Sequence, residues 1–383
     1  MDALPLDALP LDALPLDALP LDLLRLVFSY VPWRDRMRCR AVCRRWLGAL
    51  RDAAAWRVVL RDRLRSLLGE YCRRGDADAV RRVISHFGLT MDDALHSGAL
   101  RVACVYGHEQ IARWYMGRWP VAQWLARWPA RVPDLQPRAA DIVCGQYSIF
   151  SAVCECGHLG VARWLTKTFD ISAQDVRRSN TALGEACGRG HLAVAKWLAA
   201  TFGLTAADVR VSDNYALRRA CQNGHLDVAK WLAATFGLTA ADARAQANYA
   251  LRRACQNGHL DVAVWLTATF GLTAADARAG NNCALQLACE YGYLEVVKWL
   301  VATFGLTTDD ARSDNNYALR LACRAVNFNV VRWLVSTFDF GVEDARSCRD
   351  EIGTVEYAEF FDDIFTEAGI VLEAAAESAT ASD

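Results

Sequence analysis

The apolar residues of the chain recur with a helical period inside a unit of 34 residues. The unit reads most clearly over 214–247, and the next unit begins at Asn248 and repeats it almost letter for letter. Two residue types mark the repeat. The tryptophans are Trp164, Trp197, Trp231, Trp265, Trp299 and Trp333, and the cysteines are Cys72, Cys104, Cys154, Cys187, Cys221, Cys255, Cys289 and Cys323. A fixed period of this length indicates stacked supersecondary units.

The first half of each unit predicts a short helix. Leu217, Ala220 and Cys221 have the i, i+3, i+4 spacing of one narrow apolar stripe. Asn214 precedes them and is expected to be the N-cap, because its side chain can accept from free amides of a first helical turn. Gly224 follows and can take the left-handed conformation that ends a helix.

The second half predicts another helix, over about 226–235. Its apolar residues are expected to face inward, and they are Val228, Ala229, Trp231 and Leu232. After Phe236 and Gly237, the residues from Thr239 to Asp242 have the pattern of a capping box, so one further helical turn is predicted. Two short helices cannot bury their apolar faces alone, whereas stacked copies can, so the unit predicts an all-α solenoid.

The second-helix sequence, Gly224-His225-Leu226-x-Val228-Ala229-x-Trp231-Leu232, resembles the ankyrin repeat, whose second helix begins G-H-L-x-V-V-x-L-L. The first helix departs from the family, since Tyr215-Ala216-Leu217-Arg218 stands where ankyrin repeats have T-P-L-H. The unit is also one residue longer than the usual 33. The resemblance implies an interaction solenoid, in which a helical turn can replace the extended finger of the family.

About eight copies are predicted over 66–347, with an insert at about 117–138. The insert contains Trp119, Trp124, Trp128 and four prolines. Inserts in repeat arrays map to loops, often on the binding face, and a packed elbow between copies is an equal alternative. Residues 348–383 leave the repeat. They are expected to form a capping helix, followed by an acidic tail, with an apolar face of Tyr357, Phe360, Phe361, Ile364, Phe365 and Ala368.

A second apolar pattern occupies residues 19–60. Leu23, Leu24, Val27, Phe28 and Val31 fall on one helix face, and a second helix is predicted around Trp46. A segment of about forty residues buries too little surface to be stable alone, so these large apolar groups favour a partner. An ordinary helical cap for the solenoid is the alternative.

The order L-P-x-x-L-L-x-x-V-F-S-Y-V-P, followed by V-C-R-x-W, resembles the F-box. The resemblance implies docking on the Skp adaptor of cullin-RING ubiquitin ligases. The residues expected to dock are Leu19, Pro20, Leu23, Leu24, Val27, Phe28, Val31, Met37, Val42, Cys43 and Trp46. Residues 1–18 belong to a low-complexity D-A-L-P-L tract, which is either a disordered expansion of this segment or a set of spare Leu-Pro docking sequences.

Composition narrows the possible functions. The formal net charge of −1 argues against general nucleic-acid binding. The F-box-like region itself is basic, with twelve arginines in 25–65 against Asp35, Asp52 and Asp62, which favours steering toward an acidic adaptor over contact with nucleic acid. No charge-free apolar run reaches 18 residues, and no signal-peptide pattern opens the chain, so neither a membrane span nor secretion is expected. A reducing compartment, the cytoplasm, fits cysteines that belong to the repeat.

Intrinsic chemistry is not expected. Five histidines also follow the repeat, at His108, His158, His191, His225 and His259. Equivalent positions in stacked helices lie roughly 8–10 Å apart, which is too far for disulfides or for shared ligation of one zinc ion. We therefore expect the histidines to order the turns in which they lie, the cysteines to pack as small apolar groups, and no metal or cofactor.

The position after the first-helix leucine varies between copies that otherwise agree, as an exposed binding face requires. Its residues are Arg101, Ser151, Gly184, Arg218, Arg252, Gln286 and Arg320. Arginine is favoured at binding hot spots, so Arg101, Arg218, Arg252, Gln286 and Arg320 are predicted to contact a target with an acidic patch.

These patterns predict an F-box substrate receptor that binds a Skp-type adaptor, and through it a cullin ligase, and holds a target protein on its repeats. The chain itself is expected to be non-enzymatic and monomeric outside the ligase. An interaction scaffold, or a decoy that occupies the adaptor without delivering a substrate, is the alternative. The combination of an F-box with degenerate ankyrin-like repeats resembles proteins of large DNA viruses of amoebae, which would act on host proteins.

Overall fold

A computed structural model describes residues 66–118, 148–349 and 361–370, apart from positions 88, 91–93, 95–96, 180 and 362. The chain divides into two compact units, Met1–Leu67 and Leu68–Asp383. The described residues fall almost wholly in the second unit. The D-A-L-P-L tract, the predicted F-box segment and the insert beyond Arg118 lie outside the described residues.

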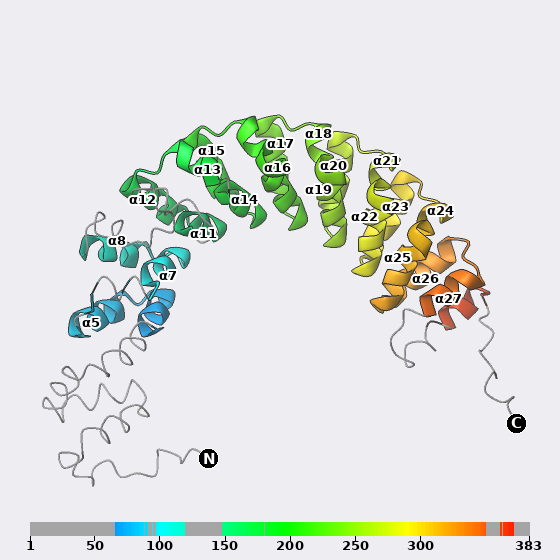
Figure 1. Ribbon diagram of the computed structural model, residues 1–383, viewed down its shortest axis with the longest axis horizontal. Helices are drawn as coiled ribbons and strands as arrows, with labels where there is room; N and C mark the ends of the chain where they lie inside the picture. The colour runs from blue at the N-terminus through cyan, green and yellow to red at the C-terminus, as the bar shows by residue number, and fades with distance from the viewer. Residues whose placement is uncertain are drawn as a thin grey trace, which may run out of the picture. The chain divides into compact units, whose positions relative to one another are not determined.

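The second unit is built from pairs of antiparallel helices that follow one another in chain order (Figure 1). The first helices of the pairs are 66–74, α7 (Ala99–Val105), α11 (Ile149–Glu155), α14 (Thr181–Gly188), α16 (Ala206–Gln222), α19 (Ala245–Gln256), α22 (Ala279–Glu290) and α25 (Ser313–Arg324). The second helices are α5 (Ala77–Phe87), α8 (Glu109–Arg118), α12 (Leu159–Phe169), α15 (Leu192–Phe202), α17 (Leu226–Phe236), α20 (Leu260–Phe270), α23 (Leu294–Phe304) and α26 (Phe328–Thr337). No strand occurs among the described residues. The all-α solenoid of about eight helix pairs is therefore confirmed.

The core runs through the stack between successive first helices. α14 packs on α16, α16 on α19, α19 on α22 and α22 on α25, while each first helix also packs on its own second helix. Leu217, Ala220 and Cys221 are buried as predicted, and the eight repeat cysteines have no solvent exposure. Each repeat thus shares its apolar face with both neighbours, which makes the solenoid cooperative between adjacent copies.

A left-handed turn, which the sequence did not reveal, precedes the first helix of each central repeat. In α16, Ser212, Asp213 and Asn214 have φ values of 54°, 55° and 60°. Asn214 is buried, and its Nδ2 donates at 3.4 Å to the carbonyl oxygen of Asp242, near the other end of the same 34-residue unit. The prediction that Asn214 caps its own helix is therefore wrong, because the side chain joins the start of its repeat to the end and its buried Oδ1 accepts no hydrogen bond.

The further helical turn is present where the sequence predicts it, in α18 (Ala240–Ala243), α21 (Ala274–Ala277) and α24 (Thr308–Ala311). The carboxylate of Asp242 accepts from the Thr239 amide at 2.8 Å and from the Thr239 hydroxyl at 3.0 Å, which completes the predicted capping box. A short helix thus stands where an ankyrin repeat has its extended finger. The flanking repeats carry longer versions, α13 (Ala173–Ser179) and α27 (Val342–Arg349).

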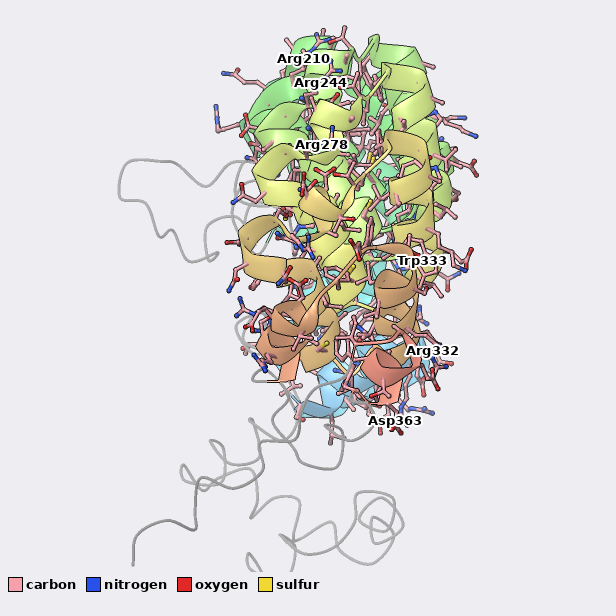
Figure 2. The ribbon with its side chains drawn as sticks, turned by 90° about the vertical axis from the view of Figure 1, so that its right-hand side faces the viewer. Arg210, Arg244, Arg278, Arg332, Trp333 and Asp363 are labelled. Carbon is pink, nitrogen blue, oxygen red and sulfur yellow. The ribbon has the colours of Figure 1, made fainter. Side chains whose placement is uncertain are left out.

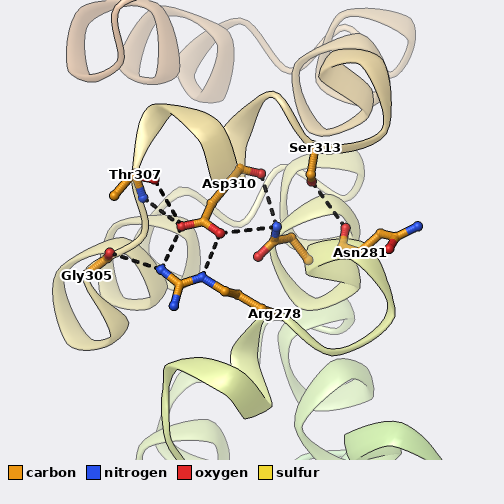
Figure 3. A network of polar contacts seen from close by, with 7 residues as sticks. Arg278, Asn281, Gly305, Thr307, Asp310 and Ser313 are labelled. Atoms are coloured by element: carbon orange, nitrogen blue, oxygen red, sulfur yellow. Dashed lines mark hydrogen bonds and ion pairs between the residues drawn. The ribbon is translucent and has the colours of Figure 1, made fainter.

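The same carboxylate binds an arginine of the preceding repeat. Arg210 donates from Nε and Nη2 to Asp242 at 2.9 and 3.1 Å. The contact recurs down the solenoid, and Figure 3 shows the copy in which Arg278 binds Asp310 and the Gly305 carbonyl. Arg210, Arg244 and Arg278 follow one another along one side of the stack (Figure 2). These pairs form an inter-repeat ladder, which we call the linking edge, of Arg177–Asp208, Arg210–Asp242, Arg244–Asp276, Arg278–Asp310 and Arg312–Asp344.

The histidines act between repeats rather than within them. Gly224 adopts φ 78°, as its place after the first helix predicts, and the His259 ring of the next repeat packs against it. His108 shows the bond such a ring makes, since its Nε2 lies 3.0 Å from the carbonyl oxygen of Arg73 in the preceding repeat. The expectation that each histidine orders its own turn is corrected accordingly.

Apart from the buried Trp164, the tryptophans of the repeat are less buried than predicted. Trp231 is half-buried, and its ring meets the edge of the buried Phe236 ring with centroids 5.6 Å apart. Second helices of neighbouring repeats touch each other less than first helices do. The Trp–Phe pair therefore lines an open gap between the second helices α15 and α17, so the prediction that Trp231 faces inward is right only in part.

A short helical segment over 361–367 packs against the last repeat. Phe361, Ile364 and Phe365 are buried, and the Phe361 ring lies 5.1 Å from that of Phe328 in α26. Arg332, labelled with Asp363 in Figure 2, pairs with Glu367 at 3.5 Å. Ala368 is exposed in a turn, so its assignment to the apolar face was wrong. Tyr357, Phe360 and the acidic tail lie outside the described residues.

Candidate functional site

The residue after the first-helix leucine holds the left-handed turn that precedes its own helix. Arg218 donates from Nε to the Asp213 carbonyl at 2.7 Å and from Nη2 to the Ser212 carbonyl at 2.9 Å. Its counterpart Arg252 donates to the Gln246 carbonyl at 2.9 Å. These bonds satisfy carbonyl groups of a strained turn with donors from the following helix, so the position has a structural role that the sequence interpretation did not include.

The predicted target-binding residues are therefore not a simple exposed row. Gln286 is buried, as are Ser151 and Gly184 at the same position, so the expectation of exposure is wrong there. Arg101 on α7 and Arg320 on α25 are half-buried. Each of the five residues belongs to a different repeat, and Arg218 and Arg252 meet at a common neighbour, the Tyr249 ring.

One repeat before Tyr249, a carboxylate is bound between the first helices α14 and α16. Glu185 of α14 accepts from the Tyr215 hydroxyl at 2.7 Å and from Nη2 of Arg219 at 3.2 Å. Burial and the bond to Glu185 raise the pKa of Tyr215 to about 12, so the phenol keeps its proton and acts as a donor. A tyrosine and an arginine one helical turn apart thus make a two-donor clamp for one carboxylate, here supplied by the neighbouring repeat.

The equivalent residues of the next repeat, Tyr249 and Arg253, have no such carboxylate. Three guanidinium groups surround the Tyr249 ring, with carbons 4.7 Å (Arg218), 4.9 Å (Arg253) and 5.9 Å (Arg252) from its centroid. Their hydrogen-bond acceptors are carbonyl, amide and thiol groups. In the part of the chain that the structure describes, none of the three pairs with an acid. The site is therefore a cluster of positive charge around an aromatic ring.

Sequence reasoning missed Tyr249 and Arg253, although a signal was present. The position of Arg253 in its repeat is filled down the solenoid by Glu185, Arg219, Arg253, Leu287 and Leu321, and the position of Tyr249 by Tyr215, Tyr249, Cys283 and Tyr317. Only α16 and α19 combine a tyrosine with an arginine, and only α16 follows a glutamate. Comparing pairs of positions across repeats would have revealed this difference.

Burial keeps two of the repeat cysteines in the thiol form. Burial raises the pKa of the Cys72 thiol to about 11 and that of Cys104 to about 12, so these thiols stay protonated and unreactive. Within the described residues no group of three histidine, cysteine or acidic side chains is placed to hold a metal ion. The described helices also include none that is both long enough and apolar enough to cross a bilayer.

Comparison with protein families agrees with both patterns of the sequence. The family model described as F-box-like matches residues 16–62. The family model described as ankyrin repeats (3 copies) matches residues 149–247 and 251–344, which together make up about half of the chain. No curated protein matches the chain. The helix pairs, their left-handed glycine turns and these matches lead to one conclusion: the chain belongs to the ankyrin-repeat family and carries an F-box-like segment near its N-terminus.

Proposed function

We propose that the chain is the substrate-recognition subunit of a cullin-RING ubiquitin ligase of the SCF type. An F-box-like segment joined to ankyrin repeats fits the general role of an adaptor that recognises substrates for such ligases. In the proposal, the segment docks on a Skp-type adaptor and the solenoid holds the target. The chain contributes proximity, because it brings a target lysine near the charged conjugating enzyme.

The observation that carries the proposal is the match of residues 16–62 to the F-box-like family, in a chain whose repeats hold a basic cluster without an acidic partner among the described residues. The residues proposed to dock on the adaptor are the apolar set centred on Leu23, Leu24 and Phe28. Twelve arginines in 25–65 would steer the segment toward an acidic adaptor surface. The suggested relationship to proteins of large DNA viruses, and action on host proteins, stay predictions.

Co-purification from cells tests the proposal. Phe28→Ala removes a large aromatic group from the docking helix, at a cost of about 3–5 kcal/mol, and should lower adaptor recovery by well over tenfold. The tract offers a matched control, because the same Leu-Pro dipeptide occurs outside the predicted segment at Leu9-Pro10 and inside it at Leu19-Pro20. Alanine at Leu19 and Pro20 should weaken adaptor binding, whereas alanine at Leu9 and Pro10 should not.

The proteins recovered separate the alternatives. Adaptor together with cullin supports a receptor, adaptor without cullin indicates a decoy, and neither indicates an interaction scaffold. Wild-type adaptor recovery by the Phe28→Ala variant, with an unchanged melting profile of the solenoid, would contradict F-box docking.

A further inference from the structure

The molecule contains its own example of how a tyrosine–arginine pair recognises a ligand. In α16, Tyr215 and Arg219 both donate to Glu185, which α14 supplies from the preceding repeat. Two donors from one helix on one carboxylate, one of them charged, form a charge-assisted arrangement stronger than a neutral hydrogen bond. Within the protein, Glu185 thus already accepts the hydrogen bonds that this pair donates.

One repeat further on, the same pair is present and the carboxylate is missing. Tyr249 and Arg253 correspond to Tyr215 and Arg219, but the position of Glu185 is taken by Arg219, which is itself bound to Glu185. Within the described residues no hydrogen bond reaches the Tyr249 hydroxyl. Arg253 donates only to the amide oxygen of Gln256 in its own helix. The second pair therefore has donors in place and no anion to receive them.

The arginines around Tyr249 and Arg253 further favour the binding of an anion. Arg218 is fixed by two backbone carbonyls and by the amide oxygen of Gln246 at 2.7 Å, so its charge is held beside Tyr249 without being neutralised. Arg252 is half-buried, and its Nε is fully buried with no hydrogen-bond partner. Three like charges close together, with neutral acceptors only, are unfavourable unless a negative group joins them.

We propose that Tyr249 and Arg253, together with Arg218 and Arg252, form a carboxylate-binding site that takes a glutamate or aspartate side chain of the target protein. The inference rests on the proposed function, because it names the class of target that the receptor would hold. Tyr249 donates from its hydroxyl and Arg253 from its guanidinium, as Tyr215 and Arg219 do to Glu185. Arg218 and Arg252 select for negative charge, so the preferred target segment is acidic over several residues.

The other repeats define where the site ends. Leu287 and Leu321 replace the arginine in α22 and α25, and Cys283 replaces the tyrosine in α22. The repeats of α22 and α25 therefore lack the tyrosine–arginine pair, and in α16 the pair already binds Glu185. The site is therefore confined to α19 and the edge of α16 instead of extending along all five predicted positions.

Fluorescence anisotropy with the full chain and a labelled peptide of ten glutamates tests the proposal, with a ten-glutamine peptide for comparison. At about 0.15 M salt the wild-type chain should bind the glutamate peptide more tightly than the glutamine peptide. Arg253→Leu should weaken glutamate-peptide binding about tenfold, since it removes a charge-assisted bond. Leucine stands at the equivalent positions of α22 and α25, so the fold accommodates it. Tyr249→Phe should weaken binding about threefold to tenfold.

Matched variants supply the controls. Tyr317→Phe changes a tyrosine whose repeat has Leu321 instead of arginine, and Tyr215→Phe changes the pair that Glu185 already fills. Both should bind the peptide as the wild-type chain does. The basic segment 25–65 is the same in every variant, so differences in affinity between variants report on the site.

Equal affinity of wild-type and Arg253→Leu chains for the glutamate peptide would overturn the inference, as would an equal loss in the Tyr317→Phe control. That failure is distinguishable from failure of the proposed function, because adaptor recovery is measured separately and does not involve α19. If the wild-type chain binds the peptide through Arg253 but recovers no adaptor, the carboxylate-binding site is supported and the proposed ligase role is contradicted.

Discussion

The linking edge and the first-helix face of the solenoid use the same residue types in different ways. Along the linking edge, an arginine of each central repeat meets an aspartate of the next, at 2.7–3.1 Å from Arg177–Asp208 to Arg312–Asp344. On the first-helix face, Arg219 has an acidic partner whereas Arg218, Arg252 and Arg253 have none among the described residues. Positions that repeat without change hold neighbours together, and positions that change between copies leave charge available for a partner.

The largest expected effect comes from breaking the linking edge. Asp276 is buried and accepts from Arg244, from the amide and hydroxyl of Thr273, and from Asn248. Asp276→Ala leaves these donors without their acceptor and should lower the free energy of unfolding by about 3 kcal/mol. Urea denaturation followed by circular dichroism measures the loss.

Lys230→Ala is the control for this variant, since Lys230 is exposed on α17 and makes no hydrogen bond or ion pair with another described residue. It should change the free energy of unfolding by less than about 0.5 kcal/mol. Similar losses in the two variants would show that the linking edge is not what joins the repeats.

The tryptophan column should give the next largest effect. Trp231 is half-buried against Phe236, so Trp231→Ala should cost about 2–3 kcal/mol, below the range for a fully buried aromatic residue. Because repeats couple to nearest neighbours, loss in the middle of the stack should separate thermal unfolding into stages. A melting profile within about 2 °C of the wild-type one would contradict a packing role for the column.

Acid should weaken the linking edge in a defined window. Burial alone raises the pKa of Asp242, but hydrogen bonds from Arg210 and Thr239 outweigh it and lower the pKa to about 2 from 3.8. A carboxylate with a lowered folded-state pKa stabilises the fold fully above its unfolded pKa, and the stabilisation is lost as pH falls through the folded value. The urea midpoint should therefore fall between about pH 4 and pH 2.

Arg210→Gln tests this prediction further, because it removes the bond that lowers the Asp242 pKa. The variant should therefore show a smaller fall of the urea midpoint on acidification than the wild-type chain. Arg346→Gln removes an exposed pair with Glu343 and should leave the acid profile like that of the wild-type chain. An identical acid dependence in wild-type and Arg210→Gln chains would exclude the ion pair as its source.

The elements that sequence alone predicts are those fixed by local patterns. The second helices, the left-handed Gly224 and the capping box of Thr239 and Asp242 each depend on residues a few positions apart. The role of Asn214 does not follow from local pattern because its partner, the Asp242 carbonyl, is 28 positions away near the other end of the same repeat. Only the folding of the whole unit brings the two together.

The candidate site could be predicted only in part, because it too depends on residues that are far apart in the sequence. Arg218 and Arg252 were singled out by their variation, but their bonds to the left-handed turn depend on a backbone conformation that non-glycine residues seldom adopt. Tyr249 and Arg253 become a site only when the register between α16 and α19 places them beside an unpaired cluster. Docking by residues 19–60 stays a prediction, since that segment lies outside the described residues.

The most direct test of the account compares the proteins recovered from cells with the wild-type chain, Phe28→Ala and Arg253→Leu, quantified by mass spectrometry. A receptor with two independent binding regions should lose its partners separately. Phe28→Ala should lose the adaptor and cullin and keep the target, whereas Arg253→Leu should lose the target and keep the adaptor and cullin. Loss of all partners together in either variant, with the solenoid still folded, or loss of none in both, would contradict a receptor with two independent binding regions.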